Sequence, residues 1–487
     1  MIFEQIVWRD LGCASYLVGC QVAGEAVVVD PPLDVREVLA LCKRNGVRLV
    51  GVIETHTHAD HVSGHGVLAH GQGCWIAIHE VANAVYEHRP LRDADRIEVG
   101  NIALDVFHTP GHRPEHCCIV VSDRTRGDEP WLVLSGDALF VGDSGRPDLA
   151  VAGDEGATAL YRSLHERLGA LDNGVELFPG HVAGSLCGRG MSAKPSSTMG
   201  FERRFNPMLA EMTVDQFVKL ANQDLAPKPP TMARIVELNR GPLLTETPRA
   251  RIISLPAADA QVLDVRDGAS FAGGHMAGSF NDSVAVSGFG NRCGFALDPE
   301  REVVVVSDSH EQAEEAARKL AGVGFTQLAE VGFGIDSAHA HARFEPVGLG
   351  VMAALADRGE LQVVDVREAS EQSELATGAI AVPYRLLAEA DLSALDPEKP
   401  TAVVCHTGTR TPLAASLLAR RGFTHVRPVL DEGMGNWGAR DQEAAEAELA
   451  KSSARASAKA RAQAAKVETG PVRSPETAAE PVEPLSG

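Results

Sequence analysis

Three histidines and one aspartate stand in a single run directly after a hydrophobic, β-branched segment, and this arrangement limits the folds available to the chain. The run THTHADH, residues 55–61, follows LVGVIE, which is typical of a buried strand. Three more polar residues each follow a segment of the same kind: His112 after IALDVF, Asp137 after WLVLSG, and His181 after VELF. Loops at one edge of a sheet bring such side chains together, so the sequence predicts a layered α/β domain with a ligand-rich edge.

These loops supply seven candidate metal ligands, namely His56, His58, Asp60, His61, His112, Asp137 and His181. Scattered surface histidines would not gather on four strand-end loops, and we therefore prefer a metal site. A donor set of imidazole and carboxylate groups without thiolate suits zinc or non-haem iron. The residues alone leave both metals open.

A second candidate site is the run CHTGTR, residues 405–410, near the other end of the chain. Cys405 follows the strand-like segment TAVV and precedes a predicted helix, so a thiolate there would face backbone N–H groups and the positive end of the helix. Gly408 lets the loop curl, and Arg410 adds a cation. The sequence predicts a reactive thiol that holds an anion or a persulfide, the alternative being a buried structural cysteine.

Composition and charge exclude several classes of protein. A net charge of −21 argues against a nucleic-acid partner, which would require a clustered basic surface. No apolar run near the N-terminus is long enough for a signal peptide or a membrane span, so we expect a cytoplasmic protein with no membrane partner. The nine cysteines form no CxxC pairs, and most of them, Cys13 included, are expected to be buried as small hydrophobic residues.

The chain of 487 residues is long enough for about three domains. QVLDVRDGASF from residue 261 is echoed by QVVDVREASEQ from residue 362, which indicates an internal duplication. We expect domains at 1–245, 250–347 and 348–440, followed at 441–487 by an Ala-rich possible helix and a disordered tail. Aligning VGF at 323 with RGF at 421 places Ser307 opposite Cys405 and Gln312 opposite Arg410, so the first copy is predicted to be inert.

The first 240 residues or so resemble the metallo-β-lactamase fold, in which two sheets are packed between helices. That superfamily contains both binuclear zinc hydrolases and mononuclear iron persulfide dioxygenases. The segments GRPDL, residues 145–149, and PGHVAGSLCG, from residue 179, are similar to the persulfide dioxygenases. The resemblance implies one Fe(II) per chain, held by His56, His112 and Asp137; two zinc ions are the alternative.

The same resemblance gives roles to the remaining residues. The other four candidate ligands, His58, Asp60, His61 and His181, would orient the iron ligands and handle protons, or would hold a second metal in a binuclear hydrolase. Arg146 would meet the carboxylate of a thiol carrier, or else form an ordinary loop salt bridge. Cys187 could reach the metal pocket and accept sulfur there, the alternative being simple burial.

DVRE, CHTGTR and EGMGNW together resemble the rhodanese sulfurtransferases. The four residues between Cys405 and Arg410 give the tight loop of those enzymes rather than the wider loop of related phosphatases. Cys405 and Arg410 would then be catalytic, and the loop residues Thr407, Gly408 and Thr409 would bind substrate. One departure is Leu375, which replaces the histidine of the usual GHxxG turn.

The predicted fold class is α/β, with an N-terminal αββα metallo-β-lactamase sandwich followed by two rhodanese-like α/β domains that have parallel sheets. The implied enzyme oxidises a low-molecular-weight thiol persulfide with O2 to sulfite and converts sulfite plus persulfide to thiosulfate, which would detoxify sulfide. Alternatives are a glyoxalase-II-like binuclear zinc thioester hydrolase, a β-lactamase-like hydrolase and a non-catalytic sulfur carrier or sensor. Assembly into a homo-oligomer is compatible with the sequence.

Overall fold

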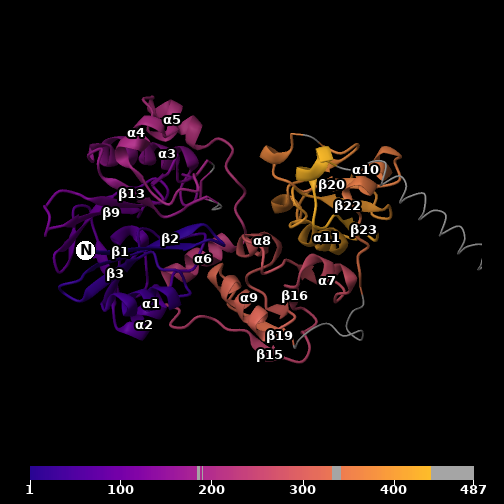
Figure 1. Cartoon of the computed structure of the whole chain (residues 1–487), viewed down its shortest axis with the longest axis horizontal. Coiled ribbons are helices and arrows are strands. Elements are labelled where there is room, and N and C mark those ends of the chain that lie inside the picture. Colours follow the sequence, from indigo (N-terminus) through magenta and orange to yellow (C-terminus); the bar gives the residue numbers. More distant parts are fainter. Residues whose placement is uncertain (184–186, 189, 332–341, 374, 440–487) are drawn as a thin grey trace, which may run out of the picture.

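A computed structural model describes residues 1–183, 187–188, 190–331, 342–373 and 375–439 (Figure 1). The predicted Ala-rich helix and tail at 441–487 lie outside these residues. The N-terminal part holds two six-stranded sheets that face each other. The first sheet has the order β1 (Ile2–Trp8), β2 (Cys13–Cys20), β3 (Glu25–Val29), β4 (Arg48–Ile53), β5 (Trp75–His79) and β6 (Arg89–Leu91). The second has the order β14 (Ser197–Thr198), β13 (Glu176–Pro179), β10 (Leu132–Gly136), β9 (Cys117–Asp123), β8 (Ile102–His108) and β7 (Arg96–Val99).

Helices cover the outer face of each sheet. α1 (Arg36–Asn45) and α2 (His65–Gln72) pack on the first sheet, and α3 (Gly153–Arg162) and α5 (Val214–Ala221) pack on the second. Strand β10 shows why the layers form: Leu132 and Leu134 point between the sheets, whereas Val133 points toward the helices. The predicted αββα sandwich is confirmed.

Two further helices and a small sheet complete this part. They are α4 (Met199–Phe205), α6 (Thr231–Arg240) and the two-stranded sheet of β11 (Leu139–Phe140) and β12 (Asp143–Ser144). A π turn lies at Ser163–Arg167 and 3-10 turns lie at Glu80–Ala82, Leu168–Ala170 and Pro207–Leu209, with later ones at Ala369–Glu371, Tyr384–Leu386 and Met434–Ala439.

The rest of the chain contains two parallel sheets with related topology. The first has the order β15 (Arg251–Ile253), β19 (Leu328–Val331), β18 (Val303–Val306), β16 (Gln261–Asp264) and β17 (Phe280–Asn281), with helices α7 (Gly268–Gly273), α8 (Phe289–Ala296) and α9 (His310–Gly322). The second has the order β21 (Ile380–Ala381), β20 (Gln362–Asp365), β22 (Thr401–Val404) and β23 (Val426–Pro428), with α10 (Leu349–Asp357) and α11 (Thr411–Arg420).

The predicted duplication is visible strand by strand. Strands β17, β16, β18 and β19 recur in the same neighbour order as β21, β20, β22 and β23, and every pairing in both sheets is parallel. Buried ion pairs follow the equivalent strands, with Arg266 Nη2 2.6 Å from Asp264 Oδ2 and Arg367 Nη2 2.7 Å from Asp365 Oδ2. Two rhodanese-like α/β units with parallel sheets are therefore confirmed as the fold class of this region.

The first repeat lies between the metallo-β-lactamase-like part and the second repeat (Figure 1). One hydrophobic cluster runs through all three, from Leu11 and Ile235 through Phe289 and Leu320 to Leu413. Helix α11 packs on β17 and α7, so the helix that follows Cys405 rests on the first repeat. In the part of the chain that the structure describes, no helix is both long and apolar enough to cross a membrane.

Candidate metal centre

The loop that carries the histidine run follows β4 and is held by buried side chains from distant parts of the chain. Asp30 accepts hydrogen bonds from the backbone N–H and the hydroxyl of Thr55, at 2.7 and 2.8 Å. The amide of Asn239, on α6, donates to the carbonyl oxygens of His58 (3.0 Å) and His61 (2.8 Å). Its carbonyl oxygen accepts the N–H of Ser63 at 2.8 Å. The loop is thereby fixed from both sides.

His56, His112 and Asp137 converge as the sequence predicts. One donor atom from each lies within 4.8 Å of the others, and all three residues are buried. His112 Nε2 is 3.4 Å from Asp137 Oδ2, while His56 Nε2 and Asp137 Oδ2 have no hydrogen-bond partner among the described residues. Buried polar atoms without partners are rare in folded proteins. These donor atoms therefore fit a metal ion.

The opposite side of each donor group is fixed by a hydrogen bond. His112 Nδ1 lies 2.9 Å from the carbonyl oxygen of Arg146, an arrangement that leaves Nε2 free to bind a metal. His56 Nδ1 lies 2.9 Å from the hydroxyl of Thr55, and Asp137 Oδ1 lies 2.7 Å from His181 Nδ1. Gly145 permits this packing, because a Cβ there would lie 2.0 Å from the Asp137 carbonyl oxygen.

The electrostatics of the three residues favour metal binding. Burial raises the pKa of Asp137, but the neighbouring His181 and His112 outweigh it and lower that pKa to about 2. Burial, together with the nearby His58 and His112, lowers the pKa of His56 well below its usual value. Burial also lowers the pKa of His112, although Asp137 opposes the shift. A carboxylate and two neutral imidazoles are the forms that bind a metal.

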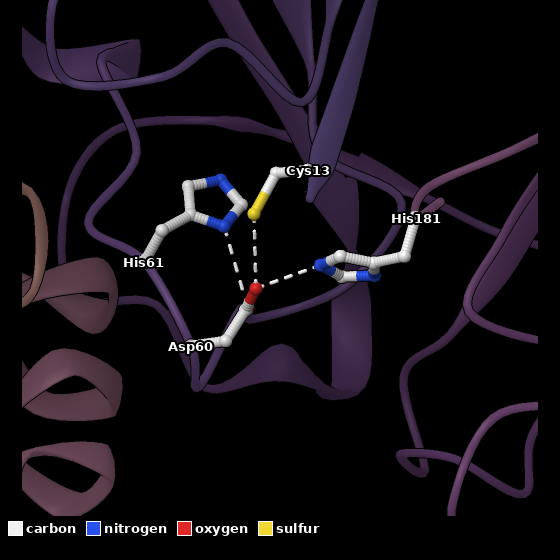
Figure 2. Close-up of side chains that lie close together, drawn as sticks. All are labelled: Cys13, Asp60, His61 and His181. Atoms are coloured by element: carbon white, nitrogen blue, oxygen red, sulfur yellow. Dashed lines mark hydrogen bonds and ion pairs between the residues drawn. The ribbon is translucent and has the colours of Figure 1, made fainter. Parts of the chain in front are cut away.

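Asp60, His61 and His181 form a second cluster, which Cys13 joins (Figure 2). His181 Nε2 lies 2.7 Å from Asp60 Oδ2, the thiol of Cys13 donates to the same oxygen at 3.2 Å, and His61 Nδ1 lies 3.3 Å from Asp60 Oδ1. We had expected Cys13 to be an ordinary buried residue. It is buried, but it also contacts the predicted ligand Asp60.

His58 lies between the two clusters, with its ring 4.2 Å from those of His56 and His61, but it belongs to neither donor group. Its Nε2 is 3.1 Å from Asp30 Oδ1 and 3.3 Å from Glu54 Oε2, inside a third buried group formed by these residues. Burial alone would lower the pKa of His58, but the carboxylates of Asp30 and Glu54 raise it well above the usual value. An imidazolium does not bind a metal, so this environment disfavours His58 as a ligand.

Sequence reasoning missed His116, the second histidine of the segment TPGHRPEH. Its Nε2 accepts the backbone N–H of Asp137 at 2.9 Å, and its Nδ1 lies 2.9 Å from the hydroxyl of Thr109. Burial lowers the pKa of His116 to about 3, which keeps the ring neutral and able to accept this bond. His116 thus fixes the backbone of the candidate ligand Asp137.

Arg146 and Cys187 border a cavity of about 20 Å³ beside the metal ligands. Arg146 Nε and Nη2 donate to the carboxylate of Asp148 at 2.7 and 2.8 Å, which is the loop salt bridge considered as the alternative. Its Nη1 is buried without a partner among the described residues. Cys187 is buried, and its thiol lies within 4.8 Å of donor atoms of Asp137 and His181, so it does reach the metal pocket.

The second candidate site follows β22. The N–H of Gly408 donates to Cys405 Sγ at 3.1 Å, as the sequence predicts for an anion-stabilising loop. Gly408 has φ of 85°, and a Cβ there would lie 2.7 Å from the backbone nitrogen of Asp431. Arg410 donates two hydrogen bonds to Glu371, at 2.7 and 2.8 Å, and the exposed hydroxyls of Thr407 and Thr409 lie 3.1 Å apart.

The equivalent loop of the first repeat is built differently. Ser307 follows β18, but helix α9 begins at His310, so only residues 307–309 separate strand and helix, whereas residues 405–410 do so in the second repeat. The hydroxyl of Ser307 donates to the carbonyl of Ser309 at 2.9 Å, and the side chain of Gln312 accepts the N–H of Asp308 at 2.8 Å. The buried Cys293 lies on α8 instead, 3.9 Å from Asp282.

Comparisons with known proteins agree with this architecture. Residues 8–181 match the metallo-beta-lactamase superfamily, and residues 350–440 match the rhodanese-like domain. The mitochondrial persulfide dioxygenase ETHE1 of Bos taurus is 33% identical over 218 residues, covering 44% of this chain and 78% of the relative. The Homo sapiens protein of the same name is 32% identical over 227 residues, covering 46% and 82%.

Two further relatives are informative. A hydroxyacylglutathione hydrolase of Nitrosococcus oceani is 34% identical over 188 residues, covering 37% of this chain and 66% of the relative. The crystal structure of a metallo-beta-lactamase from Staphylococcus aureus subsp. aureus COL superposes with a TM-score of 0.64 at 28% identity, covering 69% of this chain and 99% of that one. Residues 1–245 make up only about half of the 487 residues, whereas the superposition covers 69% of them. The superposition therefore extends into the later sheets.

Proposed function

Since this chain belongs to the metallo-β-lactamase superfamily, is a homologue of the persulfide dioxygenases and carries a rhodanese-like domain, we propose that it is a non-haem iron persulfide dioxygenase fused to a sulfurtransferase. The substrates would be a low-molecular-weight thiol persulfide, O2 and sulfite. We propose domain limits of 1–245, 250–347 and 348–440. A cytoplasmic location and a homo-oligomeric state remain predictions.

The observation that carries this proposal is the donor set of His56, His112 and Asp137. Two neutral imidazoles and one carboxylate, of which His56 Nε2 and Asp137 Oδ2 have no hydrogen-bond partner among the described residues, form the two-histidine, one-carboxylate arrangement suited to non-haem iron. A binuclear zinc hydrolase would also use His58, whose Nε2 faces Asp30 and Glu54 while its Nδ1 is buried without a hydrogen-bond partner among the described residues. The similarity to the persulfide dioxygenases therefore supports the dioxygenase over the hydrolase.

An Fe(II) ion held by His56, His112 and Asp137 would supply redox chemistry and open coordination positions for the persulfide sulfur and dioxygen. The chain's own groups prepare that site. The Arg146 carbonyl and His181 fix the orientation of His112 and Asp137, at 2.9 and 2.7 Å. The unpartnered Nη1 of Arg146 is available to bind a carboxylate of the thiol carrier. One persulfide, one O2 and one water would give the free thiol, sulfite and two protons.

Cys405 would carry out the second reaction. Its thiolate attacks the outer sulfur of a persulfide, the S–S bond breaks, and the released thiol takes up the proton. Cys405 then holds a persulfide, which the N–H of Gly408 stabilises at 3.1 Å in the present geometry. Sulfite attacks the outer sulfur, giving thiosulfate and the free Cys405 thiolate. The first repeat lacks both the cysteine and the six-residue loop, and we propose that it is catalytically inert.

The similarity to hydroxyacylglutathione hydrolases supports one alternative function, that of a binuclear zinc thioester hydrolase. That enzyme would cleave a glutathione thioester without oxygen. Such an enzyme would need Asp60, His61 and His181 as ligands of a second metal, and these side chains instead form hydrogen bonds with one another and with Cys13.

The proposal is tested by measuring the products from glutathione persulfide in oxygenated buffer. Wild-type protein should consume oxygen and yield thiosulfate, whereas Cys405→Ser should consume oxygen at the same rate and yield sulfite. Cys293→Ser, which removes a buried cysteine from the inert repeat, is the matched control and should behave as wild type. Absence of oxygen uptake by wild-type protein, or thiosulfate formation by Cys405→Ser, would refute the corresponding half of the proposal.

A further inference from the structure

The two donor clusters at the metal centre differ in how their atoms are spaced. Two donor atoms bound to one ion at about 2.0–2.1 Å in tetrahedral geometry lie about 3.3 Å apart. His112 Nε2 and Asp137 Oδ2 are 3.4 Å apart, which matches this separation. His181 Nε2 and Asp60 Oδ2 are 2.7 Å apart, which is a hydrogen-bond distance. The first cluster is spaced for an ion, and the second is closed by a direct contact.

The donor atoms of the second cluster are also occupied. Both nitrogens of His181 are used, one by Asp60 and the other by Asp137. Asp60 Oδ2 accepts from His181 and from the thiol of Cys13, and Figure 2 shows these groups around the carboxylate. By contrast, His56 Nε2 and Asp137 Oδ2 in the first cluster have no partner among the described residues.

Cys13 is held in place by the backbone. Residue 13 begins β2 and forms a bridge with His181, flanked by hydrogen bonds from Ala14 N–H to the Gly180 carbonyl (2.7 Å) and from Val182 N–H to the Gly12 carbonyl (2.8 Å). The exposed fractions of Cys13 and Asp60 are 4% and 7%, so water does not replace the thiol. The thiol of Cys13 is therefore a rigidly held donor, and it fixes the position of Asp60 Oδ2.

We propose that Cys13 determines the number of metal ions, because its thiol holds Asp60 against His181 and thereby closes the position that a second ion would occupy. This inference rests on the proposed single-metal function and names the residue that enforces it. A hydrogen bond to a charged group is strong enough to change the affinity of the second position by roughly 10- to 100-fold when it is removed. Cys13 is a positioning residue in this account and binds no metal itself.

The test counts cobalt ions per chain after Co(II) is added to metal-free protein. Wild-type protein should bind about one ion, and Cys13→Ala and Cys13→Val should bind about two, because Asp60, His61 and His181 become available. Cys13→Val fills the space of the thiol and guards against a folding defect in Cys13→Ala. Cys20→Ala, at the other end of β2 and in contact with Gly100 rather than the cluster, is the control and should bind one ion.

Two outcomes would overturn the inference. One is an unchanged count of one ion in both folded Cys13 variants. The other is a count of two in wild-type protein with a thiolate-to-cobalt charge-transfer band, since Cys13 would then be a ligand. The count does not depend on oxygen chemistry. If wild-type protein binds one ion but consumes no oxygen with a persulfide, the proposed function fails while the role of Cys13 stands.

Discussion

The backbone N–H of Val62 donates a hydrogen bond to the carbonyl oxygen of Gly322 at 2.8 Å, which joins the loop of the candidate metal ligands to the last residue of α9 in the first repeat. Trp8 packs in the same place, with its ring 6.4 Å from that of His61 in an edge-on arrangement. The first repeat is therefore part of the support of the metal centre. Helix α11 of the second repeat, which follows Cys405, packs on β17 and α7 of the first repeat, so the first repeat contacts the surroundings of both sites.

Substituting Gly322 tests this support. A Cβ at residue 322 would lie 2.3 Å from the ring of Trp8, so Gly322→Ala must displace Trp8 and with it the contact to His61. We expect a loss of about 1–3 kcal/mol in the free energy of unfolding and about a tenfold loss in metal affinity. Gly273→Ala, which meets open space on α7 of the same repeat, is the control. Equal metal affinity in the two variants would contradict the supporting role.

Asn239 provides a second test, from the side of α6. Asn239→Leu keeps the volume but removes three hydrogen bonds, which leaves the carbonyls of His58 and His61 and the N–H of Ser63 unpaired. We expect denaturant unfolding to report a loss of roughly 3 kcal/mol or more, because each buried unpaired group costs about 1–3 kcal/mol. Metal affinity should fall in the same variant. Asn45→Leu, in a half-exposed contact with Glu4, should change neither quantity by much.

The environment of Asp148 predicts that the free energy of unfolding decreases in acid. Burial raises its pKa, but hydrogen bonds from Arg146 and then Lys228 lower that pKa to about 2. Since the folded pKa lies below the unfolded value, the stabilisation is present above about pH 4 and is lost as the pH falls toward 2. Because the group is only half buried, solvent screening reduces this contribution to about 1 kcal/mol. Asp148→Asn should remove this component from the unfolding free energy of metal-free protein, and an unchanged pH profile would contradict it.

Glu371 should limit the access of anions to Cys405. Its carboxylate accepts hydrogen bonds from both terminal nitrogens of Arg410, which lies in the CHTGTR loop. Glu371→Gln should free Arg410 and lower the KM for thiosulfate in sulfur transfer to cyanide by about three- to tenfold, the effect of roughly 1 kcal/mol. Glu360→Gln, on an exposed side chain of the same repeat, serves as the control. A raised KM would show that Glu371 positions Arg410 productively instead.

A restored cysteine should not revive the first repeat. In a Cys405→Ser background, Ser307→Cys places a thiol after β18, but the three-residue connection to α9 offers no loop of N–H groups such as the one Gly408 provides. We expect no measurable sulfur transfer from thiosulfate to cyanide in this double variant. Activity at even a tenth of the wild-type rate would show that the missing nucleophile, rather than the loop, made this repeat inert.

The sequence predicts that His56, His112 and Asp137 lie close together, because each follows a segment with a clear hydrophobic strand pattern. Loops at one edge of a sheet bring such residues together. The periodicity predicted a layered α/β domain, the family resemblance implied the αββα order of its layers, and the echo of residues 261–271 at 362–372 indicated the duplicated sheets. Cys13 escaped prediction because its role depends on a bridge to His181, 168 residues away, which no local pattern encodes. Glu54 is the last residue of the segment LVGVIE, which the sequence predicts as a strand. The early start of α9 at His310 could not be predicted, because aligning the two repeats residue by residue does not show where a helix begins.

The central claim is that the N-terminal centre uses iron to oxidise a persulfide. It is tested most directly by quantifying metals in anaerobically purified protein and recording oxygen consumption by the same sample after glutathione persulfide is added. We predict about one iron per chain and one O2 consumed per persulfide, with uptake abolished in His112→Ala. Two zinc ions per chain with no oxygen uptake and rapid hydrolysis of a glutathione thioester would contradict the account.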